Sequence, residues 1–132
     1  MKAPSYKTKT KKILIVDDDA DLTRMIQFLL EKRDFNVLTS NDGEEGLKQV
    51  NLYKPDLILL DLNMPKIGGI EFCHKVRDGQ EGVDPAIIIL TARANIEPTL
   101  RDMNVNGLLT KPFEISQLLE EIDRVFQDRG ID

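Results

Sequence analysis

Short apolar runs alternate along this chain with segments whose apolar residues recur at helical spacing, and this alternation constrains the fold most. The predicted strands are 13–16, 36–39, 56–60, 86–90 and 106–110. Three of these runs are almost unbroken, which is typical of strands covered on both faces. The predicted helices are 22–30, 43–52, 69–77, 96–103 and 114–127. Five β-α units in a row predict a single-domain α/β fold with a doubly wound parallel sheet.

Composition excludes several classes of protein. The chain has 132 residues, of which 41% are hydrophobic and 31% are charged, as in globular domains. It contains no apolar run of about 20 residues, so no membrane segment is expected. The net charge of −5, without a basic stripe, gives no support for nucleic-acid binding. We expect a flexible basic tail over residues 1–10 and the folded domain over 11–129.

Polar side chains follow four of the predicted strands where each strand ends. Asp17 and Asp18 follow the first strand and Asp61 follows the third, while Thr91 and Lys111 follow the fourth and fifth. The carboxyl ends of parallel strands meet at one edge of a sheet, where such folds bind ligands. A single aspartate after a strand is often only a turn or helix cap. Four polar strand ends together indicate a shared site.

The residue types at this edge indicate a particular chemistry. Neighbouring carboxylates repel one another unless a cation lies among them, and hard oxygen ligands suit Mg²⁺. A carboxylate that attacks phosphorus needs positive charge to offset the phosphoryl oxygens, and Lys111 and a divalent ion provide it. Aspartyl phosphates are established covalent intermediates. The pattern therefore predicts reversible phosphorylation of an aspartate with Mg²⁺.

Four segments carry a resemblance to a known family. They are Ile13-Leu14-Ile15-Val16-Asp17-Asp18-Asp19, Leu59-Leu60-Asp61-Leu62-Asn63-Met64-Pro65 with Gly69, Leu90-Thr91-Ala92, and Thr110-Lys111-Pro112-Phe113. In this order and spacing they look like the signature segments of two-component response-regulator receiver domains, over about residues 11–128. The resemblance implies a flavodoxin-like, chemotaxis-regulator-like fold with strand order 2-1-3-4-5.

The resemblance also implies roles for the acidic residues. Asp61 would be the phosphoacceptor of a two-component phosphorelay. Asp18 and Asp61 would bind Mg²⁺ directly, together with the backbone carbonyl of Asn63, and Asp17 would act mostly through water. Asp19 is expected to cap the first helix rather than to bind metal.

Further implications concern the other side of the site and its partners. Thr91 would turn toward the phosphoryl group, and Lys111 would contact it from the opposite side, with a cis peptide before Pro112. The donor would be the phosphohistidine of a histidine kinase or phosphotransfer protein, and this chain itself would be cytoplasmic. A downstream protein would read the face formed by the fourth helix, fifth strand and fifth helix. Such a domain catalyses only its own phosphorylation and dephosphorylation.

Some positions depart from the family pattern or modulate it. Leu108 stands where many receivers carry a tyrosine or phenylalanine, so coupling of Thr91 to an aromatic ring is not expected in its usual form. Asn104 replaces a frequent glycine, and asparagine tolerates the left-handed conformation. Arg93, two residues after Thr91, is expected either to influence the phosphate lifetime or to lie in solvent.

Two alternatives remain at this point. Asp19-Ala20-Asp21-Leu22-Thr23 matches the Asp-x-Asp-x-Thr motif of haloacid-dehalogenase-type phosphohydrolases, although it falls beyond the strand end. The second alternative is a receiver-shaped binding module that is never phosphorylated.

Two further residues are assigned plain structural roles, and one question about the chain stays open. The single His74 is expected on a helix surface, so the phosphoryl donor should come from another protein. The single Cys73 is expected to be a small buried residue. Only two residues follow Gly130, so the sequence leaves open whether the domain acts alone or belongs to a longer regulator.

Overall fold

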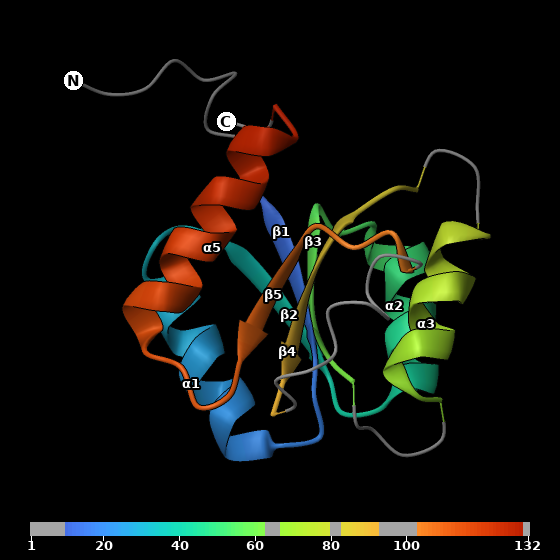
Figure 1. Ribbon diagram of the computed structural model, residues 1–132, viewed down its shortest axis with the longest axis horizontal. Helices are drawn as coiled ribbons and strands as arrows, with labels where there is room; N and C mark the ends of the chain where they lie inside the picture. The colour runs from blue at the N-terminus through green and yellow to red at the C-terminus, as the bar shows by residue number, and fades with distance from the viewer. Residues whose placement is uncertain (1–9, 63–66, 80–82, 93–102, 131–132) are drawn as a thin grey trace.

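The computed structural model describes residues 10–62, 67–79, 83–92 and 103–130. Within them, five strands alternate with four helices along the chain (Figure 1). The strands are β1 (Lys12–Val16), β2 (Asn36–Ser40), β3 (Leu57–Asp61), β4 (Ala86–Thr91) and β5 (Gly107–Thr110). The helices are α1 (Ala20–Glu31), α2 (Gly43–Tyr53), α3 (Gly69–Arg77) and α5 (Ile115–Asp128). The predicted helix at 96–103 lies almost entirely outside the described residues.

The strands form one parallel sheet in the order β2-β1-β3-β4-β5, which confirms the predicted order. Val16 of β1 pairs with both Ser40 of β2 and Leu60 of β3, so the ends of these strands are aligned. Asp61 is the last residue of β3 and pairs with Leu90 of β4. All the carboxyl ends of the strands therefore lie at one edge of the sheet, here called the carboxyl edge.

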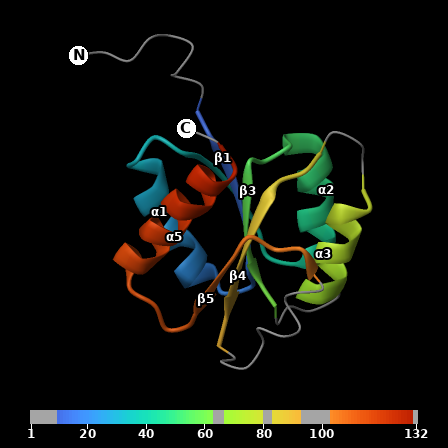
Figure 2. The same cartoon turned by 45° about the horizontal axis from the view of Figure 1, so that its top comes forward.

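Two hydrophobic cores cover the two faces of the sheet. Figures 1 and 2 show α1 and α5 on one face and α2 and α3 on the other. Alternate residues of β1 point to opposite faces, so Ile13 and Ile15 pack with α1 and α5 while Leu14 and Val16 pack with α2 and α3. Every residue of β3 and β4 is buried, as the unbroken apolar runs predict.

Acidic side chains cap the amino-terminal ends of two helices. The carboxylate of Asp19 accepts a hydrogen bond from the N–H of Leu22 at the start of α1, at 3.1 Å. Asp42 does the same for the N–H of Glu45 in α2, at 2.8 Å. Both carboxylates satisfy a backbone donor that the helix itself leaves unpaired. The prediction that Asp19 is a helix cap is confirmed.

An arginine holds several segments together at the opposite, amino edge of the sheet. The Arg77 guanidinium, at the end of α3, donates to the carbonyl oxygens of Asn104 (3.0 Å) and Pro85 (2.8 Å). It also donates to the side-chain oxygens of Asp84 (2.8 Å) and Asn106 (3.3 Å). Burial lowers the pKa of the Arg77 guanidinium, and the nearby Asp84 carboxylate offsets part of that effect. Arg77 thus fixes the start of both β4 and β5 to α3.

A second side-chain network supports β5, which is an edge strand. The Glu121 carboxylate on α5 accepts the backbone N–H of Leu108 at 3.2 Å, and Arg124 donates to the carbonyl of Asn106 at 3.0 Å. Arg124 is also paired with Glu121 at 2.9 Å, and its hydrogen bond holds the pKa of that carboxyl below its usual range. Glu121 thus accepts a backbone N–H of β5, a strand that has only one neighbouring strand.

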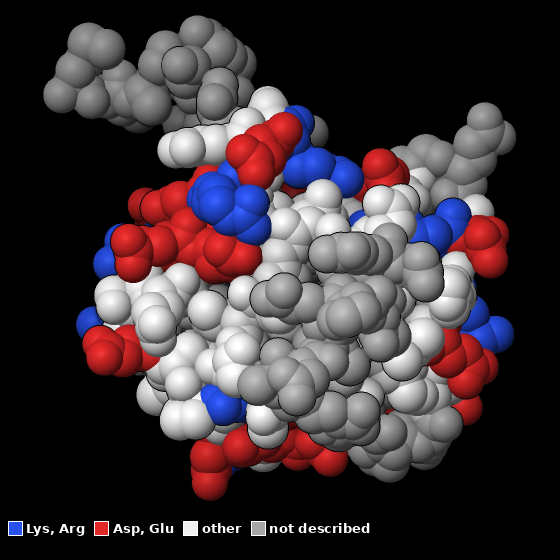
Figure 3. All heavy atoms as spheres, viewed as in Figure 1, with Lys and Arg blue, Asp and Glu red and all other residues white. Residues whose placement is uncertain are grey.

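Charges of both signs occur on the face of the molecule that Figure 3 shows. On the face shown in Figure 3, Lys and Arg side chains are scattered among acidic ones and form no continuous basic stripe in the described part of the chain. None of the helices within the described ranges combines the length and the apolar character that a membrane crossing requires.

Candidate functional site

Three carboxylates meet at the carboxyl edge of the sheet, and we call them the acid cluster: Asp17, Asp18 and Asp61. Each offers an oxygen atom within 4.8 Å of the others. The register of β1 and β3 explains the meeting, because Val16 pairs with Leu60 and the next residues are Asp17 and Asp61. Asp17 and Asp61 are buried and Asp18 is exposed. The predicted proximity of the first and third strand ends is confirmed.

Lys111 brings positive charge to the acid cluster from the end of β5. Its Nζ atom lies 2.9 Å from Asp17 Oδ2 and 3.9 Å from Asp61 Oδ2. Its backbone N–H donates to the carbonyl of Thr91 at 2.7 Å, which anchors the loop after β5 to the end of β4. The Lys111–Pro112 peptide is cis, as expected. Lys111 therefore neutralises part of the acid cluster, and its closer carboxylate partner is Asp17.

Thr91 is the last residue of β4 and is fully buried. It pairs with Thr110 of β5 one position before Lys111. β4 lies between β3 and β5 in the sheet, so Thr91 ends a strand that separates Asp61 from Lys111. The structure thus places all five described residues of the predicted site at the carboxyl edge.

The acid cluster fits a divalent cation. Of its members, Asp17 already accepts hydrogen bonds from the N–H of Asp19 (2.9 Å) and from Lys111, whereas Asp18 extends toward solvent. These three carboxylates lie within 4.8 Å of one another, and in the described part of the chain Lys111 is the cation that pairs with two of them. Carboxylate oxygens with access to water are the ligand set that Mg²⁺ prefers.

The phosphohydrolase-like motif does not form a site. Asp19 caps α1 through its side chain, and Asp21 pairs with Arg24 at 2.7 Å on the exposed side of that helix. Thr23 is buried on the other side, so the three motif residues point in different directions. The structure therefore gives no support for a haloacid-dehalogenase-type phosphohydrolase site at this motif.

Several other predictions can be compared with the structure. Cys73 is buried and surrounded by apolar residues, and burial raises the pKa of its thiol to about 12, so it is not a reactive thiolate. His74 is exposed on α3. Asn104 has a φ of 55°, the left-handed conformation expected for it. Leu108 is partly buried against the core on the α2 and α3 side. The backbone carbonyl of Asn63 and the side chain of Arg93 lie outside the described residues.

One part of the carboxyl edge was not predicted. Thr23 and Ser40 bury hydroxyl groups that make no hydrogen bond within the described part of the protein. The sequence holds a weak signal for them, since each is a polar residue at a position that the helical or strand period assigns to the core. Both residues line a cavity beside Asp17.

The family model described as the response regulator receiver domain matches residues 13–123, which include the acid cluster, Thr91 and Lys111. The chain belongs to this family. Its fold, with parallel strands in the order 2-1-3-4-5, is the flavodoxin-like fold of chemotaxis-type response regulator receivers.

Curated relatives support the same assignment. The chain is 40% identical over 105 residues to the alkaline phosphatase synthesis transcriptional regulatory protein PhoP of Bacillus subtilis, covering 78% of this chain and 43% of PhoP. It is 36% identical over 117 residues to the response regulator ArlR of Staphylococcus aureus, covering 87% of this chain and 52% of ArlR. The chain therefore spans about half the length of these relatives.

Solved structures match over nearly the whole domain. The chemotaxis response regulator CheY4 of Vibrio cholerae has a TM-score of 0.82 and 31% sequence identity, covering 89% of this chain and 99% of that one. The BeF3-activated N-terminal receiver domain of RstA from Klebsiella pneumoniae has a TM-score of 0.77 and 27% identity, covering 86% and 97%. Receiver domains of this family serve two-component signalling, and the chain shares that class of function.

Proposed function

We propose that Asp61 is the phosphoacceptor of a two-component phosphorelay and that its aspartyl phosphate switches the surface seen by a downstream protein. The observation that carries the proposal is the position of Asp61 in the buried end of β3, within 4.8 Å of two other carboxylates and 3.9 Å from Lys111 Nζ. A buried carboxylate without compensating partners would be costly. The neighbouring carboxylates and Lys111 therefore indicate a site that binds charged groups.

The proposed reaction is a direct transfer of the phosphoryl group to Asp61. An Asp61 carboxylate oxygen attacks the phosphorus of a partner's phosphohistidine; the new O–P bond forms as the P–N bond breaks, and the imidazole leaves with the bond's electron pair. Asp18, Asp61 and the backbone carbonyl of Asn63 would hold Mg²⁺, with Asp17 acting through water. The ion would supply positive charge to the phosphoryl oxygens.

Lys111 and Thr91 complete the proposed site. Lys111 pairs with Asp17 at 2.9 Å, and a small movement toward Asp61 would let its ammonium group contact a phosphoryl oxygen. The Thr91 hydroxyl would donate to another of these oxygens. Because Leu108 occupies the usual aromatic position on β5, we propose that aliphatic repacking accompanies phosphorylation there.

The partners follow from the family. The chain would be cytoplasmic, its donor would be a histidine kinase or phosphotransfer protein, and the downstream protein would bind the face that includes β5 and α5. Neither partner is expected to be nucleic acid or membrane for this domain itself. PhoP is described as a transcriptional regulatory protein, and its similarity to this chain covers 43% of its length.

The direct test compares Asp61→Asn with Asp34→Asn after incubation with acetyl phosphate and Mg²⁺. Asp34 is exposed, lies near the amino edge and has a φ of 69°, a conformation that asparagine also tolerates. Intact-mass measurement should show one base-labile phosphoryl group on the wild type and on Asp34→Asn, and none on Asp61→Asn. Full phosphorylation of Asp61→Asn would overturn the proposal.

A second measurement addresses the alternative of a module that is never phosphorylated. Mg²⁺ with beryllofluoride, a mimic of the phosphoryl group, should shift the NMR signals of Asp61 and Thr91. An unchanged spectrum, together with no phosphate uptake from acetyl phosphate, would favour the unphosphorylated module instead.

A further inference from the structure

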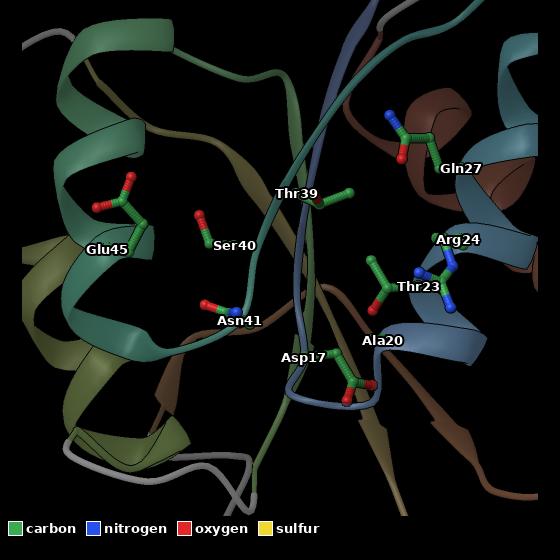
Figure 4. A pocket seen from close by; sticks show the side chains of 9 residues that line it. All are labelled: Asp17, Ala20, Thr23, Arg24, Gln27, Thr39, Ser40, Asn41 and Glu45. Atoms are coloured by element: carbon green, nitrogen blue, oxygen red, sulfur yellow. The ribbon is translucent and has the colours of Figure 1, made fainter.

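The first residue of α2 is a glycine that the backbone conformation does not require. Gly43 follows the capping residue Asp42, is buried, and has a φ outside the left-handed region that favours glycine. Figure 4 shows this start of α2 from close by, with Asn41 before it and Glu45 in its first turn. Alanine favours a helix more than glycine does, so the glycine calls for an explanation in packing.

The backbone of Ile67 fills the space that a side chain would need at Gly43. A Cβ atom at Gly43 would lie 2.7 Å from the carbonyl oxygen of Ile67 and 3.0 Å from its Cβ atom. A Cβ atom essentially never comes within 3.0 Å of a nonbonded heavy atom. The start of α2 is therefore in direct contact with the segment that joins β3 to α3, and a methyl group has no room between them.

Helix α2 itself is closely packed on the core one turn later. A Cβ atom at Gly46 would lie 2.9 Å from Phe72 Cε2 and 3.1 Å from Val16 Cγ1, so α2 already lies tightly on α3 and β1. A rigid shift of α2 would disturb this packing, whereas Ile67 belongs to a connecting segment and is only partly buried. A contact introduced at Gly43 should therefore displace Ile67 more than it displaces α2.

The start of α3, just after Ile67, packs on the backbone that follows Asp61. The N–H of Gly69 donates to the carbonyl oxygen of Leu62 at 3.1 Å. A Cβ atom at Gly69 would lie 2.6 Å from Leu62 Cα and 3.2 Å from the carbonyl oxygen of Asp61. Only one residue separates Ile67 from Gly69, so a displacement of Ile67 should reach the Asp61–Leu62 peptide.

We propose that Gly43 is a positioning residue for Asp61. By leaving room for the Ile67 backbone, Gly43 lets the first turn of α3 pack closely on the Asp61–Leu62 peptide, which holds the Asp61 carboxylate in place within the acid cluster. Misplacing a reacting group by about 1 Å can slow a reaction roughly 10²-fold. The inference rests on the proposed role of Asp61 as phosphoacceptor and assigns Gly43 no contact with the phosphoryl group.

The test measures phosphorylation of Gly43→Ala by acetyl phosphate at saturating donor and Mg²⁺. The maximal rate is expressed per folded molecule, with the folded fraction taken from thermal unfolding. We expect this rate to fall about tenfold, because relief of the contact needs a shift smaller than about 1 Å. Independently of phosphorylation, the amide signals of Asp61 and Leu62 should shift in the NMR spectrum of Gly43→Ala without Mg²⁺.

Two substitutions of the same size separate positioning from general effects. Gly68→Ala lies in the same connecting segment, where a Cβ atom would meet nothing within 4 Å and the φ of −68° suits alanine. It should keep the wild-type rate and the wild-type Asp61 signals. Gly46→Ala crowds the side chains of Phe72 and Val16 from the same helix. It should lower the melting temperature with little change in the rate per folded molecule.

The outcomes distinguish this inference from the proposed function. A wild-type maximal rate in Gly43→Ala, or a rate loss matched by Gly46→Ala or Gly68→Ala, would overturn the positioning role while Asp61 stays the phosphoacceptor. A wild type that takes up no phosphate would instead overturn the proposed function and this inference with it. If Gly43→Ala folds too poorly to measure, Ile67→Gly loosens the same contact without adding an atom. It should lower the maximal rate severalfold, and a wild-type rate there would also overturn the inference.

Discussion

At the amino edge of the sheet Arg77 donates hydrogen bonds to four acceptors, whereas at the carboxyl edge two buried carboxylates share one lysine. The acceptors of Arg77 are neutral except for Asp84, which is largely exposed. Asp17 and Asp61 are both buried, and Lys111 is 2.9 Å and 3.9 Å from them. At the amino edge the half-buried guanidinium of Arg77 is met by hydrogen-bond acceptors, whereas among the described residues the carboxyl edge brings three carboxylates together around Lys111.

This difference separates a structural cluster from a binding site. A buried charge that is fully hydrogen-bonded holds segments together, and its removal should reduce stability. A cluster with excess like charge stores repulsion that a bound cation relieves. We therefore expect changes at the carboxyl edge to affect phosphorylation and changes at the amino edge to affect folding.

The largest effect is expected for Lys111→Met. Loss of the ammonium group removes positive charge from the phosphoryl oxygens as they approach Asp61, and the rate of phosphorylation by acetyl phosphate should fall about 10²–10³-fold. Rapid-quench measurements at saturating Mg²⁺ provide the rate. Lys75→Met, which removes an exposed lysine on α3, serves as the control and should keep the wild-type rate. A wild-type rate for Lys111→Met would contradict the expectation that changes at the carboxyl edge affect phosphorylation.

At the other edge, Arg77→Ala should lower the free energy of unfolding by about 3 kcal/mol, because several hydrogen bonds to β4 and β5 are lost together. Chemical denaturation measures this change. Arg77→Lys keeps the charge but loses the planar donor set, so we expect it to recover only part of the loss. Phosphate uptake per folded molecule should stay normal in both variants; a large fall in uptake would mean that the two edges are coupled.

Mg²⁺ should stabilise the protein through the acid cluster. At ten times its Kd the ion adds about 1.4 kcal/mol to the free energy of unfolding by linkage, seen as a rise in melting temperature. Asp18→Asn should remove most of this rise, while Asp21→Asn, an exposed acid on α1, should not. Equal responses in the two variants would place the ion elsewhere.

The smallest expected effect concerns Glu121 on α5. The hydrogen bond from Arg124 holds the pKa of Glu121 below its ordinary value. The stability that ionised Glu121 contributes is therefore complete above a pH of about 4.3, and it is lost as the pH falls through the lower pKa of the folded state. The free-energy difference between the wild type and Glu121→Gln should therefore shrink below that pH, from a value under about 1 kcal/mol. Denaturation at several pH values, with exposed Glu120→Gln as the charge control, would detect it. A difference independent of pH would contradict the role of Arg124.

The sequence predicted the fold well because the strands carry unbroken apolar runs and the helices a clear period. All five strands were predicted, with ends that shift by at most one residue. The third strand starts at Leu57 rather than Asp56, whose side chain accepts the N–H of Lys12 at 2.8 Å. The last helix starts at Ile115, and Glu114 caps it through a capping box.

The acid cluster was also predictable, because position at a strand end is enough to bring its members together. The partners of each side chain were not. Three features depend on side-chain directions: the closer approach of Lys111 to Asp17 than to Asp61, the hydrogen bonds of Arg77 to the segments before β4 and β5, and the hydroxyls of Thr23 and Ser40 that have no partner among the described residues. No period or motif in a single sequence encodes those directions.

Asp61 ends the strand that occupies the centre of the sheet. β3 has a neighbouring strand on each side and every residue buried, so exchange of its amide hydrogens with solvent should require opening of the whole domain. The edge strand β5, which directly precedes Lys111, has one neighbouring strand and no fully buried residue, so its amides should exchange through smaller openings. The two groups proposed to meet at the phosphate thus lie at the end of a strand expected to exchange slowly and directly after a strand expected to exchange faster.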